Sequence, residues 1–231
     1  MNRTHTGRPI PLPLTMLVAF FAALTALAVS NGHDAHAHGN APGHVETPVA
    51  LSQSASALHR DMRMLWEDHI VWTRLAIISL TTGSPDTQAT VARLLKNQTD
   101  LGNAVKPFYG KAAGNALTAQ LRKHILSAAD VVAAAKAGDQ AKLADAQARW
   151  QQNANDIAGL LNSVNPRFWK LATLKAEMHK HLTLTTQEVV ARLQGNWSGD
   201  VAAYDRVHHH ILHMSDLLAD GLVKQFPKRF R

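Results

Sequence analysis

The chain contains no cysteine. It can therefore form no disulfide bond, bind no metal through thiolate, use no thiol nucleophile and attach no haem covalently. It also lacks the Gly-rich phosphate loop, the dinucleotide-binding fingerprint and the Gly-x-Ser-x-Gly nucleophile elbow, so no nucleotide cofactor is predicted. His-Glu-x-x-His and a pair of Glu-x-x-His sequences are absent too, which excludes a zinc-protease helix and a di-iron carboxylate bundle. These absences favour a protein without enzymatic activity.

Acidic residues are scarce, with 17 Asp and Glu against 24 Lys and Arg, for a formal net charge of +7 over 231 residues. The excess positive charge is scattered, and its densest group is the basic C-terminal tail, residues 228–231. No helix carries a basic stripe with aromatic residues between the charges, so nucleic acid is not predicted as a partner.

The first 30 residues have the pattern of a secretory signal peptide. Arg3 and Arg8 precede an uncharged apolar run from Leu12 to Val29, and Ala28 and Ser30 are the small residues of a cleavage site. We therefore expect an exported protein, periplasmic or secreted. The alternative is an uncleaved leader that anchors the chain in the membrane, because the run approaches the about 20 residues that a spanning helix needs.

Residues 31–49 are rich in Gly, Ala, Pro and His and show no periodicity, so we interpret them as a disordered linker. Short His-rich tracts of this kind can capture metals weakly. The remaining chain, residues 50–227, is predicted to form one helical domain.

Apolar residues recur every three or four positions throughout this domain, and no segment alternates as a strand does. The sequence thus predicts an all-α fold, an up-and-down antiparallel bundle of about six helices joined by short loops. The expected helices cover about residues 51–79, 87–105, 117–135, 143–164, 171–188 and 199–225. His69 lies 28 positions before Asn97 and His181 lies 28 before His209, which suggests two related helical hairpins.

Histidine is the abundant residue that calls for an explanation, with 14 in the chain. On the last helix His209 and His213 are four residues apart and share one face, and Asp205 lies one turn earlier. Such a pair with a nearby carboxylate is half of a site for a divalent metal. His69 or His181, which interrupt apolar stripes on other helices, would complete it from across the bundle.

The sequence accordingly predicts binding of Cu, Zn or Ni, for storage, buffering or delivery, with a metal ion as the partner. Met62, Met178 and Met214 lie near these histidines, and thioether with imidazole suits copper. For His124 alone, an ordinary hydrogen-bonded core histidine is the favoured interpretation.

Two alternatives remain open. In the first, the protein is a metal-free structural or interaction module with an envelope protein as partner, and its inward polar residues form a hydrogen-bonded network. In the second, it is an enzyme with a pocket between hairpins, using His69 with Asp100 or Glu188 as acid–base groups.

Several motifs resemble an uncharacterised family of bacterial all-helical proteins, over about residues 57–227. They are Leu65-Trp-Glu-Asp-His69 with Trp72 and Arg74, Asn97-Gln98 with Gly102, Pro107-Phe-Tyr-Gly110, Trp150-x-x-Asn153, Asn165-Pro166 and Gln225-Phe-Pro227. The resemblance implies a helical bundle with polar residues at fixed positions and supplies no established reaction. Some members are labelled glycosyltransferase, a label that the all-helical pattern does not support.

Overall fold

The computed structural model describes residues 51–231, so the predicted signal peptide and linker lie outside the described residues. The described chain is helical, without any strand, which confirms the predicted all-α fold. The elements are α2 (Gln53–Thr82), α3 (Thr87–Ala137), α4 (Gln140–Val164), α5 (Leu171–Leu193), α6 (Trp197–Gln225) and a final 3-10 turn (Pro227–Arg229). Within residues 51–231, no helix is long and apolar enough to cross a membrane.

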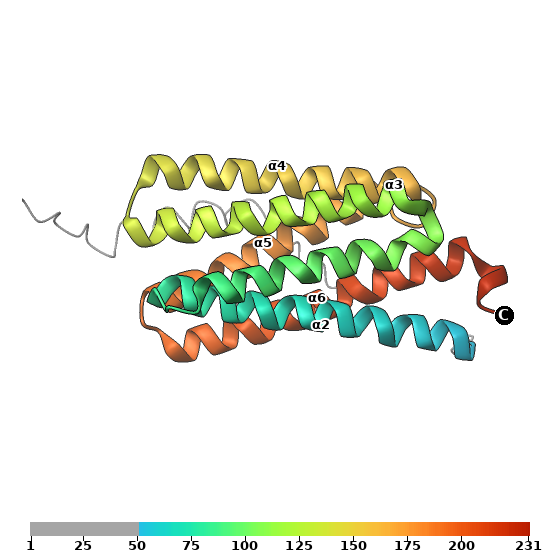
Figure 1. Ribbon diagram of the computed structural model, residues 1–231, viewed down its shortest axis with the longest axis horizontal. Helices are drawn as coiled ribbons and strands as arrows, with labels where there is room; N and C mark the ends of the chain where they lie inside the picture. The colour runs from blue at the N-terminus through green and yellow to red at the C-terminus, as the bar shows by residue number, and fades with distance from the viewer. Residues whose placement is uncertain (1–50) are drawn as a thin grey trace, which may run out of the picture.

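Helix α3 changes direction sharply at Gly110. Its backbone there has φ 82° and ψ 173°, a conformation that glycine adopts readily and other residues do not. Figure 1 shows that the chain turns back at this point, so the two halves of α3 run antiparallel. The two halves also touch, because Arg122 of the second half donates to the backbone oxygen of Leu95 in the first at 3.2 Å. Residues 51–231 therefore form six α-helical segments, as predicted, although the second and third form one bent element.

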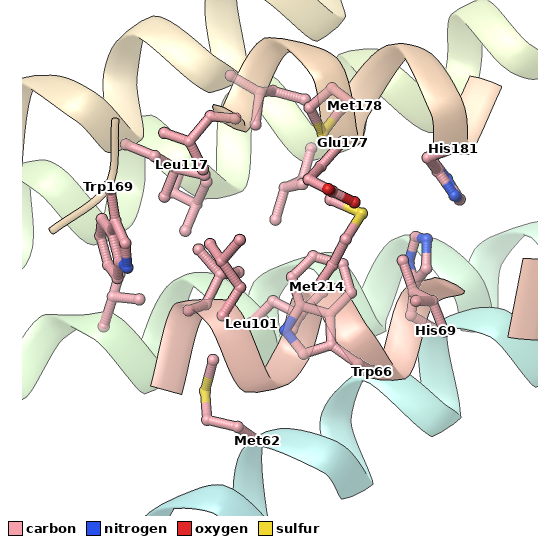
Figure 2. Close-up of a pocket in the computed structure, with 18 of the residues that line it drawn as sticks. Met62, Trp66, His69, Leu101, Leu117, Trp169, Glu177, Met178, His181 and Met214 are labelled. Carbon is pink, nitrogen blue, oxygen red and sulfur yellow. The ribbon is translucent and has the colours of Figure 1, made fainter. Parts of the chain in front are cut away.

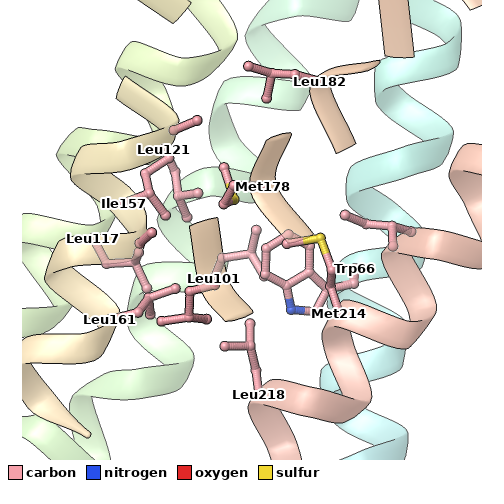
Figure 3. Close-up of a cluster of buried hydrophobic side chains, with 14 of the residues drawn as sticks. Trp66, Leu101, Leu117, Leu121, Ile157, Leu161, Met178, Leu182, Met214 and Leu218 are labelled. Atoms are coloured by element: carbon pink, nitrogen blue, oxygen red, sulfur yellow. The ribbon is translucent and has the colours of Figure 1, made fainter. Parts of the chain in front are cut away.

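The segments alternate in direction along the long axis of the molecule (Figure 1). Helix α2 packs on α3 and α6, α4 packs on α3 and α5, and α5 packs on α6, so the five elements close a ring around one core. Bulky apolar side chains from all five elements fill that core (Figure 3). Caps stop the helices where the sequence predicts breaks: Gly83 ends α2, Gly138 ends α3, and the Asp139 side chain accepts the backbone N–H of Lys142 to begin α4.

One hydrogen bond recurs in the same place in three successive hairpins. Asn97 donates to the backbone oxygen of Leu65 at 3.0 Å, Asn153 to that of Gln120 at 3.1 Å, and His210 to that of Glu177 at 3.0 Å. Each accepting carbonyl lies four residues before an inward histidine, namely His69, His124 and His181. The sequence paired His181 with His209, but the equivalent hydrogen bond comes from the next residue, His210, and a similar bond occurs in the middle hairpin. The repeat brings three histidines to the same level of the bundle.

A buried ion cluster ties α2, α5 and α6 together. Arg74 donates to Glu188 at 2.9 Å and to both carboxylate oxygens of Asp200, and Arg192 donates to Asp200 at 2.9 Å. Glu188 is fully buried, and burial, only partly offset by Arg74, raises its pKa to about 7. The cluster fixes the relative positions of the three helices, because a buried charge that loses its partner is strongly destabilising.

The close approach of the two halves of α3 depends on Gly102. A Cβ at this position would lie 2.6 Å from the backbone oxygen of Gly114 and would overlap the side chain of Thr118. We therefore expect Gly102→Ala to lower the free energy of unfolding in urea by about 1–3 kcal/mol, the usual cost of overpacking. Gly159 in α4 is the matched control, because a Cβ there meets nothing within 4 Å. Equal stability of Gly102→Ala and Gly159→Ala would contradict this packing.

Glu188 should impose a pH dependence on stability. With its pKa raised from 4.5 to about 7, the folded protein retains a proton that the unfolded chain has already released. The contribution of Glu188 to stability therefore falls as the pH rises through this interval. Glu188→Gln removes this titration. As the pH rises between these two pKa values, the free energy of unfolding of the variant should therefore increase relative to that of the wild type, by about 1.4 kcal/mol per pH unit. A difference between the two proteins that does not change with pH would contradict the raised pKa.

Candidate functional site

The five residues predicted as metal ligands lie in two places. His69 and His181 are buried at the bundle centre, whereas Asp205, His209 and His213 line a shallow surface hollow between α5 and α6. Within the hollow, His209 donates through Nδ1 to the backbone oxygen of Asp205, 3.1 Å away on its own helix. No three His, Asp or Glu side chains of the described chain already form a metal-binding group. The ligand prediction therefore stays a prediction, and the structure divides it into an outer set and an inner set.

At the outer set, a carboxylate that the sequence analysis did not single out faces two histidines of α6. Glu177 of α5 places Oε2 3.5 Å from Nδ1 of His210 and Oε1 3.9 Å from Nε2 of His213. His210 and His213 are three residues apart and so share a face of α6. Two ligand atoms bound at about 2.0–2.1 Å to one tetrahedral ion lie about 3.3 Å apart. The two observed nitrogen–oxygen distances are therefore a few tenths of an ångström longer than the distance between two ligand atoms of a bound ion.

The hydrogen bonds of His210 leave its Nδ1 lone pair available. Nε2 donates to the backbone oxygen of Glu177, so Nδ1 carries no hydrogen in the neutral ring. Burial lowers the pKa of His210, despite the opposing hydrogen bond to Glu177 and the charge of its carboxylate. In the described part of the chain, neither Nδ1 of His210 nor Oε2 of Glu177 has a hydrogen-bond partner. A histidine that donates its other N–H to a backbone carbonyl is the usual arrangement of a metal ligand.

The inner set, His69 and His181, belongs to a group of four buried imidazoles around His181. The ring centre of His181 lies 6.2 Å from that of His69, 6.0 Å from that of His124 and 6.3 Å from that of His210. The four rings come from α2, α3, α5 and α6, and each residue is 3–4% exposed. One imidazole from the first helix of each hairpin thus reaches the centre, with His210 beside them.

His124 is fully hydrogen-bonded. Its Nδ1 donates to Oδ1 of Asn153 at 2.8 Å, and its Nε2 accepts the indole N–H of Trp150 at 3.1 Å. Asn153 in turn donates to the backbone and side-chain oxygens of Gln120. Both ring nitrogens are therefore occupied, which agrees with the structural role that the sequence favours for this residue.

His69 has a weaker partner. Nε2 of Gln98 lies 3.3 Å from Nδ1 of His69 but also donates to the backbone oxygen of Leu94 at 2.8 Å and to Asn97 at 3.1 Å. An amide nitrogen has only two hydrogens, and the two shorter contacts use both. Nδ1 of His69 consequently has only a weak side-chain hydrogen bond.

His181 is the least satisfied of the four. Its Nδ1 is buried without a hydrogen-bond partner in residues 51–231. Burial, followed by the neighbouring imidazoles, lowers its pKa well below the ordinary value, and burial lowers the pKa of His69 and of His124 to about 4. All three rings are therefore neutral near pH 7, which is the form that binds metals.

An apolar cavity of about 40 Å³ extends from these histidines along the core. Figure 2 shows His69 and His181 at one end, with the carboxylate of Glu177 and the sulfur atom of Met214 nearer to them and the sulfur atom of Met178 further along the cavity. Its remaining walls are apolar and aromatic side chains of the core cluster. Glu177 thus borders both the cavity and the outer set.

The acid–base pair of the enzyme alternative is not assembled. Asp100 bonds Lys96 at 3.0 Å, and Glu188 bonds Arg74 in the ion cluster. Neither carboxylate lines the cavity that His69 borders. A compact pocket holding both groups, which this alternative requires, is therefore not found among the described residues.

Comparisons with known protein families, with curated proteins and with solved structures found no match. The family resemblance of the motifs is thus untested, and function has to be argued from the geometry of this chain.

Proposed function

We propose that the protein reversibly binds a divalent transition metal, Zn(II), Cu(II) or Ni(II), at the outer centre formed by Glu177, His210 and His213. The observation that carries the proposal is the Glu177 carboxylate, which faces the unpartnered Nδ1 of His210 at 3.5 Å and Nε2 of His213 at 3.9 Å. Imidazole and carboxylate are ligands that these ions accept, and helices hold them in place.

The surroundings of the centre suit exchange of the ion. The His213 side chain is 64% exposed, so it can swing onto an ion that arrives through the surface hollow. Lys180 and Arg206 line the same hollow, and their charges oppose a cation and weaken its binding. Moderate affinity favours buffering or delivery over permanent storage. With the predicted signal peptide, the protein would perform this role outside the cytoplasm.

One observation favours the metal-free module as a second candidate. The network of His124, Asn153, Trp150 and Gln120 is complete without any ion and joins α3 to α4. A satisfied polar network of this kind fixes helix register by itself. Under this alternative the outer histidines would be ordinary surface residues, and the protein would bind no metal stoichiometrically.

A competitive titration with a chromophoric chelator tests the proposal on the tag-free, metal-stripped protein. We expect one Zn(II) per chain. Glu177→Gln and His213→Asn should each weaken Zn(II) binding by about 100-fold or more, because loss of a residue that only supports a ligand already weakens binding by up to about this factor. Every variant retains residues 31–49, so metal held by the histidines there contributes equally to all titrations.

The matched control is His209→Asn. His209 is exposed in the same hollow, and its Nδ1 bonds its own helix, so this change should leave Zn(II) affinity unaltered. If His209→Asn weakens binding as much as His213→Asn while Glu177→Gln does not, the ligands are the pair predicted from the sequence. Wild-type affinity in both Glu177→Gln and His213→Asn would refute the outer centre.

A further inference from the structure

The end of the cavity that His69 and His181 close has the donor groups of a different kind of metal site. Besides the two imidazoles it presents the thioethers of Met178 and Met214, each residue being 5% exposed. Met178 and His181 are three residues apart and share the inward face of α5, and Met214 comes from α6. Figure 2 shows Met214 next to the two histidines and Met178 one step further along the cavity wall, where its flexible side chain has to extend to reach them.

The separation of the two imidazoles matches that of rings on opposite sides of one ion. Their centres are 6.2 Å apart. With metal–nitrogen bonds of about 2.0 Å and about 1 Å more from each nitrogen to its ring centre, opposed imidazoles have centres about 6 Å apart. The two rings are inclined by 48°, so an ion that joins them requires each ring to turn a nitrogen toward it, and the flexible methionine side chains would then approach from the side.

The polar atoms at this end lack partners that a folded protein normally supplies. Nδ1 of His181 and Oε2 of Glu177 are both buried without a hydrogen bond among residues 51–231. Leaving such a group without a partner is destabilising, and native proteins contain few of them. Because the outer centre already uses Oε2 of Glu177, the unpartnered Nδ1 of His181, beside a weakly bonded His69, is the observation that indicates a ligand at this end of the cavity.

The chemistry of the cavity selects a soft, monovalent ion. Its walls are apolar, so an ion must leave its water behind, and this loss is far more costly for a divalent ion than for a monovalent one. Thioether sulfur favours Cu(I) over Zn(II), and neutral imidazole also binds copper. The nearby Glu177 carboxylate supplies one negative charge, which balances one positive charge.

We propose that the protein has a second, inner metal site for Cu(I), in which His69, His181, Met178 and Met214 are the ligands and Glu177 balances the charge. The inner site and the outer centre have different ligands, although Glu177 borders both and the ring of His210 lies beside that of His181. The inner site gives a role to His69 and His181, which are not part of the hydrogen-bonded network of His124.

Silver(I), a redox-inert substitute for Cu(I), provides the test in chloride-free buffer. The full chain is labelled with ¹³C at the methionine methyl groups and ¹⁵N in the histidine rings, and followed by NMR. One equivalent of Ag(I) should shift the methyl resonances of Met178 and Met214 and the ring nitrogens of His69 and His181. The resonance of Met64, which is 65% exposed, should move only at higher concentration.

Variants separate the inner site from the outer centre. Met178→Leu/Met214→Leu conserves volume in the core and should weaken Ag(I) binding by at least about tenfold while leaving Zn(II) affinity unchanged. His213→Asn should do the reverse. If the double variant is poorly folded, the wild-type NMR titration alone decides.

Silver that shifts the exposed Met64 but leaves Met178, Met214 and the two rings unmoved would overturn the inner site. An unchanged Ag(I) affinity in a folded Met178→Leu/Met214→Leu protein would overturn it as well. Either result would leave the outer centre standing, because Zn(II) binding at Glu177 is measured separately.

Discussion

Removal of imidazole rings from water is the constraint on which the centre of this bundle depends. Four histidines lie in the core, each 3–4% exposed, and burial lowers the pKa of every one of them. A neutral imidazole still has one donor and one acceptor to satisfy. The surrounding helices are therefore arranged around hydrogen bonds as well as apolar contacts. Each hairpin repeats one such hydrogen bond. In each, a side chain of the second helix donates to the carbonyl that lies four residues before the inward histidine of the first helix.

The three hairpins satisfy their histidines to different degrees, and the difference locates the chemistry. In the middle hairpin, Asn153 and Trp150 occupy both nitrogens of His124. In the last hairpin, the residue equivalent to Asn153 is itself a histidine, His210, so His181 receives no comparable side-chain bond from the described chain. Ring nitrogens without a hydrogen-bond partner in the described chain therefore remain on α5 and α6, next to Glu177. Both proposed metal sites use these nitrogens.

The sequence predicted the fold well because the fold depends on local signals. Apolar stripes at helical spacing, the glycines that end helices and the Pro107–Gly110 break all act within a few residues, and the six helical segments appear where they indicate. The bend at Gly110 without a separate loop was not predicted, because it depends on the contact of Gly102 with Gly114 across the two halves.

The candidate site was harder to predict because its members meet across helices. Periodicity identified His69, His124 and His181 as inward residues, and they are buried. On α6, however, spacing alone could not show that His210 faces the core while His209 faces the solvent, since both have a plausible partner at His213. Glu177 carries no spacing signal of its own, although its place four residues before His181 matches that of Leu65 before His69. A search for repeats at that offset could have identified it.

The most direct test of the central claim is anomalous diffraction at the zinc absorption edge from crystals equilibrated with stoichiometric Zn(II). A single strong peak is expected at about 2 Å from both Nδ1 of His210 and a carboxylate oxygen of Glu177, with the ring of His213 turned toward it. A peak at His209 and Asp205 instead, or an unaltered Glu177 and His210 without any bound zinc, would contradict the claim.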